Sequence, residues 1–160
     1  MKTRLNETKY PLGPALEFLE QLWALNHALE KLSGQMARKM GVTAQQRLII
    51  RCLGRYPGLA AGSLAALLHV DPATISAALR RLEAKGLVER RRDPRDRRRA
   101  SLGLTSQGRT IDRTAPGTIE HAVERLLAAA KPADLKATAR VVAQLIARLR
   151  EERSTPGIQR

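Results

Sequence analysis

The stretch Glu89–Ser101, "ERRRDPRDRRRAS", decides how the chain folds, because it places seven arginines around an Asp-Pro turn. Two interpretations are open for it: a disordered basic segment, or a hairpin whose tip meets a negatively charged partner. The flanking runs "LVERRR" and "RRASLGL" are short extended segments on either side of the turn residues "DPRD". The pattern therefore predicts a β-hairpin with an arginine-rich tip.

Three short helices are predicted before the hairpin. Thr43 caps a helix over 44–56, a second helix covers 61–68, and Asp71-Pro72 starts a third helix that runs to Lys85 with Gly86 after it. The first helix is expected to turn inward Leu48, Ile49, Cys52, Leu53 and Tyr56. The third is expected to bury Ile75, Ala78, Leu79 and Leu82, which follow the i, i+3, i+4, i+7 spacing of one helical face.

Long amphipathic helices flank this core. A helix over 14–40 carries two apolar stripes, and the second is predicted to meet another chain. Downstream, a long helix is predicted over about 106–130, with a kink or frayed turn at Pro116-Gly117, and a last helix runs from Pro132 to about 152 with apolar residues seven apart. The predicted dimer interface includes Leu12, Leu16, Leu19 and Val142.

The predicted fold class is therefore mainly α with a small β-hairpin: a winged helix-turn-helix domain flanked by long N- and C-terminal dimerisation helices. The whole chain, 1–160, is predicted to be a single domain. Within it, 42–105 form the winged helix-turn-helix core, and 12–40 and 106–152 form the helical dimerisation region.

Composition points to a nucleic-acid partner. The formal net charge is +14 and the pI is near 11.3, mostly through arginine, which makes bidentate contacts with phosphates and base edges. Cys52 is the single cysteine, so no disulfide is expected and a reducing cytoplasm is predicted. No apolar run approaches ~20 residues, so no membrane partner is predicted.

The helix that follows Asp71-Pro72 carries the candidate chemistry. Opposite its core face lie small and basic side chains, and in a helix-turn-helix the second helix inserts its N-terminal residues into the major groove. Alanines permit close approach, Thr74 and Ser76 can bond base edges or phosphate, and Arg80 is long enough to reach guanine. The alternative is a surface helix with a small-residue face, but the adjacent arginine hairpin favours DNA binding.

The run from Thr43 to Gly108 resembles the multiple-antibiotic-resistance regulator (MarR) family. The resemblance rests on "LRRLEAKGLVERR", then "DPRDRR", then Leu104, Thr105 and Gly108. It implies homodimers that bind palindromic promoter sites, most often as repressors that small ligands release. It also implies that the helix enters the major groove and the hairpin tip the minor groove. The predicted DNA-contacting set is Ala73, Thr74, Ser76, Ala77, Arg80, Arg81, Arg95, Asp96, Arg97, Arg98 and Arg99.

Within the tip, Asp96 and Arg98 resemble the family's Asp-x-Arg pair, in which the aspartate braces the arginine that enters the groove. Arg97 and Arg99 flank that pair, so the sequence leaves open which arginine reaches in. The resemblance also implies a ligand crevice where the dimerisation helices meet the winged domain. Trp23 and His27, four apart on one helix face, are candidates to receive a small aromatic or phenolic effector. The alternative is an interface tryptophan beside an exposed histidine.

Other chemistries find little support. Cys52 lies among apolar residues in mid-helix, which disfavours peroxide sensing. The histidines are scattered without a metal-binding spacing, no nucleophile motif or phosphate loop appears, and neither a cofactor nor an enzyme activity is predicted. We therefore expect a sequence-specific, homodimeric, ligand-responsive repressor. The alternatives are a sequence-independent architectural DNA-binding protein and a winged helix reused for protein interaction.

Overall fold

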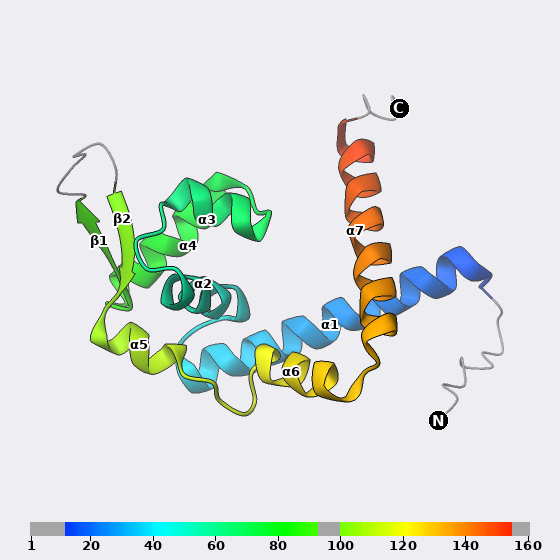
Figure 1. The fold of residues 1–160 in the computed structure, drawn as a ribbon, viewed down its shortest axis with the longest axis horizontal. Coiled ribbons are helices and arrows are strands. Elements are labelled where there is room, and N and C mark those ends of the chain that lie inside the picture. Colours follow the sequence, from blue (N-terminus) through cyan, green and yellow to red (C-terminus); the bar gives the residue numbers. More distant parts are fainter. Residues whose placement is uncertain (1–11, 93–99, 155–160) are drawn as a thin grey trace. The chain divides into compact units, whose positions relative to one another are not determined.

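The computed structural model describes residues 12–92 and 100–154 of the chain. The chain divides into two compact units, Met1–Ile119 and Glu120–Arg160. Figure 1 labels the elements along the chain. Their bounds are α1 (Pro14–Met40), α2 (Ala44–Arg55), α3 (Ala61–Leu68), α4 (Pro72–Ala84), β1 (Val88–Arg92), β2 (Ala100–Leu104), α5 (Ser106–Asp112), α6 (Ile119–Ala129) and α7 (Pro132–Ser154). The predicted fold class, helices around one small hairpin, is confirmed.

The helix boundaries follow local signals in the sequence. Pro14 occupies the first turn of α1, and Gly41 ends that helix in the left-handed conformation, at φ 72°. Thr43 caps α2 in a capping box: its Oγ1 accepts from the Gln46 N–H, and its own N–H donates to Gln46 Oε1, both at 3.2 Å. These predicted starts and stops are confirmed.

The first unit is built around one apolar core. In Figure 1, α2, α3 and α4 lie beside the β1–β2 hairpin, and α5 follows directly after it. We call α2–α5 with the hairpin, residues 42–112, the winged domain. The fully buried side chains at its centre come from all three helices: Ile49, Ile50, Leu64, Leu79 and Leu82, each 0% exposed. The core face predicted for α4 is confirmed.

The hairpin is antiparallel, with Val88 opposite Leu104 and Arg90 opposite Leu102. The Leu102 backbone also exchanges hydrogen bonds with the segment before α3: its N–H donates to Leu59 O at 3.1 Å, and its carbonyl accepts from the Gly58 N–H at 3.0 Å. The loop before α3 is thereby tied to β2. The root of the hairpin is anchored on both sides.

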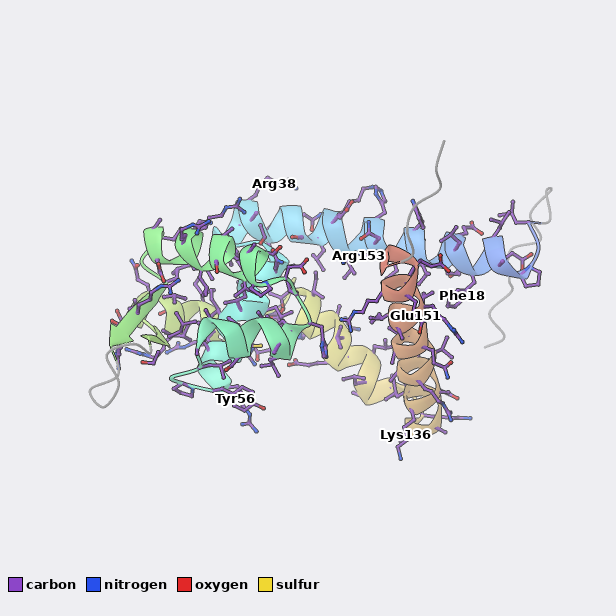
Figure 2. All side chains as sticks on the ribbon, turned by 90° about the horizontal axis from the view of Figure 1, so that it is seen from above. Phe18, Arg38, Tyr56, Lys136, Glu151 and Arg153 are labelled. Atoms are coloured by element: carbon purple, nitrogen blue, oxygen red, sulfur yellow. The ribbon has the colours of Figure 1, made fainter. Side chains whose placement is uncertain are left out.

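The inward face predicted for α2 is partly wrong. Leu48 and Tyr56 are 51% and 52% exposed, and Tyr56, labelled in Figure 2, projects outward from the end of α2. The buried positions are instead Gln46, Arg47, Ile49, Ile50 and Leu53. Tyr56 lies beyond the last helical residue, at φ −128°, so it does not continue the helical rotation. A charged residue takes an inward position because backbone carbonyls of a later segment accept its hydrogen bonds.

That residue is Arg47, which is 0% exposed. Its guanidinium donates to Ile111 O and, at 2.7 Å, to Arg113 O. One turn further along α2, Arg51 donates to Asp112 O and forms an ion pair with the Asp112 carboxylate at 2.9 Å. Carbonyls at a helix C-terminus lack intrahelical partners. The two arginines supply those partners at the end of α5.

The single helix predicted over 106–130 is wrong. The chain forms α5 and α6, and Arg113 between them is extended at ψ 137°. Pro116 disfavours the helical conformation at the residue before it, and Gly117 is left-handed at φ 79°. The helix stops at Asp112, and Arg47 and Arg51 donate to the carbonyls left at its end. As a result α5 packs on α2 and β2 within the first unit.

The second unit consists mainly of α6 and α7. Every residue of α6 is described, and none is buried. Both helices display large apolar side chains, at 43–61% exposure, to solvent. These residues are Val123, Leu126, Leu127, Val141, Val142, Ile146 and Leu149.

Candidate DNA-binding surface

Helices α3 and α4 have the geometry of a helix-turn-helix. Their axes are bent by 117°, within the range of about 90–120° found in that motif. His69 makes the turn: it is the only non-glycine residue with positive φ, at 53°, within the described ranges. Its N–H donates to Ala66 O at 3.2 Å, and the Val70 N–H donates to Ala65 O at 3.1 Å. The carbonyls at the end of α3 are therefore satisfied and the turn is fixed.

The outer face of α4 brings together the residues predicted from sequence. Ala73 and Thr74 in its first turn are exposed, as are Arg80 and Arg81 further along, while Ser76 and Ala77 are half-buried. No carboxylate of a described residue pairs with Arg80 or Arg81. The face is thus small at its N-terminal end and cationic at its C-terminal end, a distribution suited to close approach and anion contact.

The stem of the hairpin carries two ion pairs that sequence reasoning missed. Arg90 Nε lies 2.5 Å from Glu83 Oε1 of α4, and Arg91 Nη2 lies 2.5 Å from Glu89 Oε1 of the same strand. Glu83 and Arg90 are seven residues apart across a helix end and a turn, so no periodic pattern indicates the pair. The predicted tip residues Arg95, Asp96, Arg97, Arg98 and Arg99 lie outside the described residues.

The root of the hairpin is joined closely to α5. Thr105 caps α5 by accepting from the Gly108 N–H at 3.1 Å, and its hydroxyl donates to Gly86 O at 2.6 Å. The Thr105 N–H donates to Leu87 O at 3.2 Å. Gly108 lies so close to that carbonyl that an added Cβ would stand 2.0 Å from Leu87 O. This contact gives a physical reason for the "LT" and glycine pattern at 104–108.

The predicted ligand pair lies on α1. Trp23 is 68% exposed, and His27, one turn later, is also exposed. A separate cavity of about 530 Å³ lies at the other end of that helix, lined by Met40, Gly41, Lys85, Leu87, Gln107, Thr110 and Ile111. Trp23 and Met40 are 17 residues apart in one helix, or about 25 Å at 1.5 Å per residue. The cavity therefore does not include the predicted pair.

The remaining candidate chemistries add no site. Burial raises the pKa of the Cys52 thiol, which lowers the fraction of reactive thiolate at neutral pH. Within residues 12–92 and 100–154, no group of three His, Cys, Asp or Glu side chains is placed to hold a metal ion. In the same ranges no single helix is long and apolar enough to cross a membrane, although α3 and α4 pass that test together as a bent pair.

A family model described as "MarR family" matches residues 42–100, from just before α2 to the first residue of β2. Over this segment the chain is similar to the MarR family. Members of this family are transcription regulators rather than enzymes. The match covers the helix-turn-helix, strand β1 and the Glu83–Arg90 pair, but only the first residue of β2.

Two relatives and one solved structure illustrate the similarity. The HTH-type transcriptional regulator TtmR of Methylorubrum extorquens is 33% identical over 90 residues, which cover 56% of this chain and 46% of TtmR. The organic hydroperoxide resistance transcriptional regulator of Bacillus subtilis is 29% identical over 101 residues, which cover 61% of this chain and 69% of that protein. The S. aureus MepR–DNA complex matches with a TM-score of 0.68 at 21% identity, covering 82% of this chain and 97% of MepR. The alignment thus spans about half the length of TtmR, and the MepR likeness concerns the fold.

Proposed function

We propose that this MarR-like chain is a sequence-specific DNA-binding transcription regulator. The observation that carries the proposal is the outer face of α4. Small residues lie in the first turns of this face, and exposed arginines lie further along it, next in sequence to a hairpin rich in arginine. The opposite face of the helix is buried in the core. A helix held in this way can enter a major groove without losing its fold. The MepR structure, described as a DNA complex, shares this arrangement of elements.

Four residues on the outer face of α4, the recognition helix, have distinct roles in the proposal. Ala73 and Ala77 let the backbone approach the base edges and can contact thymine methyl groups. Ser76 donates or accepts a hydrogen bond at a base edge, and Arg80 reaches guanine O6 and N7. The arginines of the hairpin tip, 95–99, enter the adjacent minor groove, whose negative potential attracts guanidinium groups.

The active form in this proposal is a homodimer. Leu12, just before α1, and Leu16, Leu19 and Trp23 on α1 are 40–68% exposed, and α6 and α7 display further apolar side chains. A soluble monomer rarely leaves apolar surface of this extent in contact with water. Two recognition helices then face successive major grooves ~34–36 Å apart, and the site is a pseudo-palindrome with half-sites ~10 base pairs apart.

We further propose that the dimer represses its target promoter and is released by a small aromatic or phenolic effector. The support is the exposed Trp23–His27 pair on α1, a ring and an imidazole one helical turn apart. Such a pair can stack on an aromatic ligand and hydrogen-bond its carboxylate or hydroxyl group. Intrinsic fluorescence tests this directly, because Trp23 is the single tryptophan of the chain. Salicylate or a phenol that binds there quenches the emission, and His27→Ala weakens that binding.

The rival function is sequence-independent DNA coating or bending, which the small side chains of α4 also suit. A titration against the DNA upstream of the gene and a shuffled duplex, at about 0.15 M salt, tests the proposal. A specific regulator binds the first at least ~10³-fold more tightly. If each protomer makes ~4 phosphate contacts, the log-log salt slope is about −7. Equal affinities for the selected site and shuffled DNA would favour the architectural function.

A further inference from the structure

Among the ion pairs of the described residues, the one between Glu83 and Arg90 is the one that joins the recognition helix to the hairpin. Glu83 lies in the last turn of α4, and Arg90 lies in the middle of β1. The neighbouring pair, Arg91–Glu89, stays within one strand. The two pairs therefore have similar chemistry but different connectivity.

Arg90 lies on the side of β1 that faces α4. Side chains alternate along a strand, so Arg90 shares its face with Val88, which is 3% exposed in the core. Across the hairpin Arg90 is paired with Leu102, which is 1% exposed. The Arg90 side chain thus continues the buried face of the hairpin to the point where solvent begins, and there it meets the Glu83 carboxylate.

Glu83 is itself held rigidly. Its backbone carbonyl accepts from the Gly86 N–H at 2.9 Å, and the Leu87 N–H donates to Leu82 O at 3.0 Å, so the turn from α4 into β1 is tightly bonded. Glu83 follows Ser76 by seven residues, which places the two about 20° apart around the helix axis. The ion pair consequently fixes the hairpin along the same edge of α4 that presents Ser76.

From this geometry we infer that Glu83 is a positioning residue: it sets the angle of the wing, the β1–β2 hairpin with its tip, relative to the recognition helix. The inference rests on the proposed function. A stem of five residues is about 16 Å long, so a rotation of about 10° at its root moves the tip by about 3 Å. That displacement exceeds the tolerance of a hydrogen bond. The major-groove and minor-groove contacts therefore form together only when the angle is held.

The direction in which Glu83→Gln changes the affinity for DNA distinguishes a positioning role from a simple effect of charge. Glu83 is negatively charged and lies beside a DNA-facing surface, so removing its charge reduces repulsion of phosphates and, on charge alone, strengthens binding. A positioning role predicts the reverse on the specific site. An exposed pair contributes up to about a factor of five, and the factors of the two pairs in a dimer multiply to at most about 25. Glu83→Gln is therefore expected to weaken operator binding by roughly tenfold.

The experiment measures fluorescence anisotropy on a selected operator duplex and on a random duplex, for the full chain. Glu83→Gln is expected to lose roughly tenfold on the operator and nothing on random DNA, with weaker hydroxyl-radical protection of the minor groove. Glu89→Gln is the matched control: it removes the same charge from the strand-internal pair and does not weaken operator binding. The charge swap Glu83→Arg with Arg90→Glu restores most of the affinity lost by Arg90→Glu alone. Operator binding by Glu83→Gln at wild-type strength or tighter would overturn the inference, as would a swap no better than Arg90→Glu.

A second readout needs no DNA. In the free protein, loss of the brace speeds amide hydrogen exchange in the stem, at 88–91 and 101–104, in Glu83→Gln but not in Glu89→Gln, and the charge swap slows it again. Circular dichroism confirms that each variant is folded. If the wild-type chain fails to discriminate between DNA sequences, the proposed function fails while the exchange data still decide the brace. Unchanged exchange in Glu83→Gln would reject the brace even if the chain is a specific regulator.

Discussion

Gly108→Ala tests the contact that joins α5 to the root of the hairpin. Gly108 is buried in a regular helical turn, so its backbone conformation is one that alanine adopts readily. The cost of the substitution is therefore steric alone. The added Cβ would stand 2.0 Å from Leu87 O and 3.0 Å from the Leu87 carbonyl carbon, both of them backbone atoms.

The magnitude follows from how far the backbone must move. A Cβ and a carbonyl oxygen need about 3.2 Å, so α5 and the hairpin must separate by roughly 1.2 Å. Leu87 O also accepts the Thr105 N–H at 3.2 Å, and that hydrogen bond is lost or stretched. Overpacking lowers the free energy of unfolding by about 1–3 kcal/mol, and loss of the hydrogen bond lowers it by about 1 kcal/mol. The higher helix propensity of alanine offsets up to about 1 kcal/mol of this loss. The net loss is about 1–3 kcal/mol.

Differential scanning calorimetry measures this loss. For a chain of this length, 1–3 kcal/mol corresponds to a Tm lower by roughly 2–12 °C. The matched control is Gly62→Ala in α3, where an added Cβ meets nothing within 4 Å. That control is expected to keep or slightly raise the Tm, through helix propensity. A Gly108→Ala protein that melts at or above the wild-type temperature would refute the reasoning.

Four further outcomes are expected. Because burial raises the pKa of the Cys52 thiol, its thiolate is scarce at neutral pH. Iodoacetamide should alkylate it more slowly at pH 7.5 than a model peptide thiol, and mass spectrometry showing faster labelling would contradict this. Leu16→Glu should halve the mass in sedimentation velocity if that apolar stripe is the dimer interface. Ser76→Ala should cost about 1 kcal/mol on the preferred site only, and an equal loss on random DNA rules out its base contact. Arg81→Ala should weaken all duplexes alike and, because a dimer carries two copies of the residue, reduce the salt slope by about 2, as expected for one phosphate contact per protomer.

Much of the fold could be predicted because its signals are local. Pro14, Thr43, Asp71-Pro72 and Gly86 mark helix ends through backbone chemistry that acts within a few residues, and the structure places the boundaries there. The core face of α4 was equally predictable, because its apolar spacing matches the helical period. The same helical period predicts the outer face of α4, opposite the core face, on which Ser76 and Arg80 lie.

What could not be predicted depends on contacts between distant segments. Arg47 is buried because carbonyls more than sixty residues further along the sequence accept its hydrogen bonds. No pattern in the sequence around Arg47 predicts such a partner. The break after Asp112 is partly local, because Pro116 and Gly117 disfavour a helix there, but the arginines that bond the carbonyls at the end of α5 come from the distant helix α2. The Glu83–Arg90 pair was missed because it depends on how the hairpin folds back onto α4.

The most direct test of the central claim is a selection from a library of random duplexes with the purified full chain at about 0.15 M salt. A sequence-specific dimeric regulator enriches one pseudo-palindromic motif with half-sites ~10 base pairs apart. Its affinity for that motif is at least ~10³-fold above the affinity for the starting library. Binding without any enriched motif would contradict the account and leave the basic winged domain as a sequence-independent DNA binder.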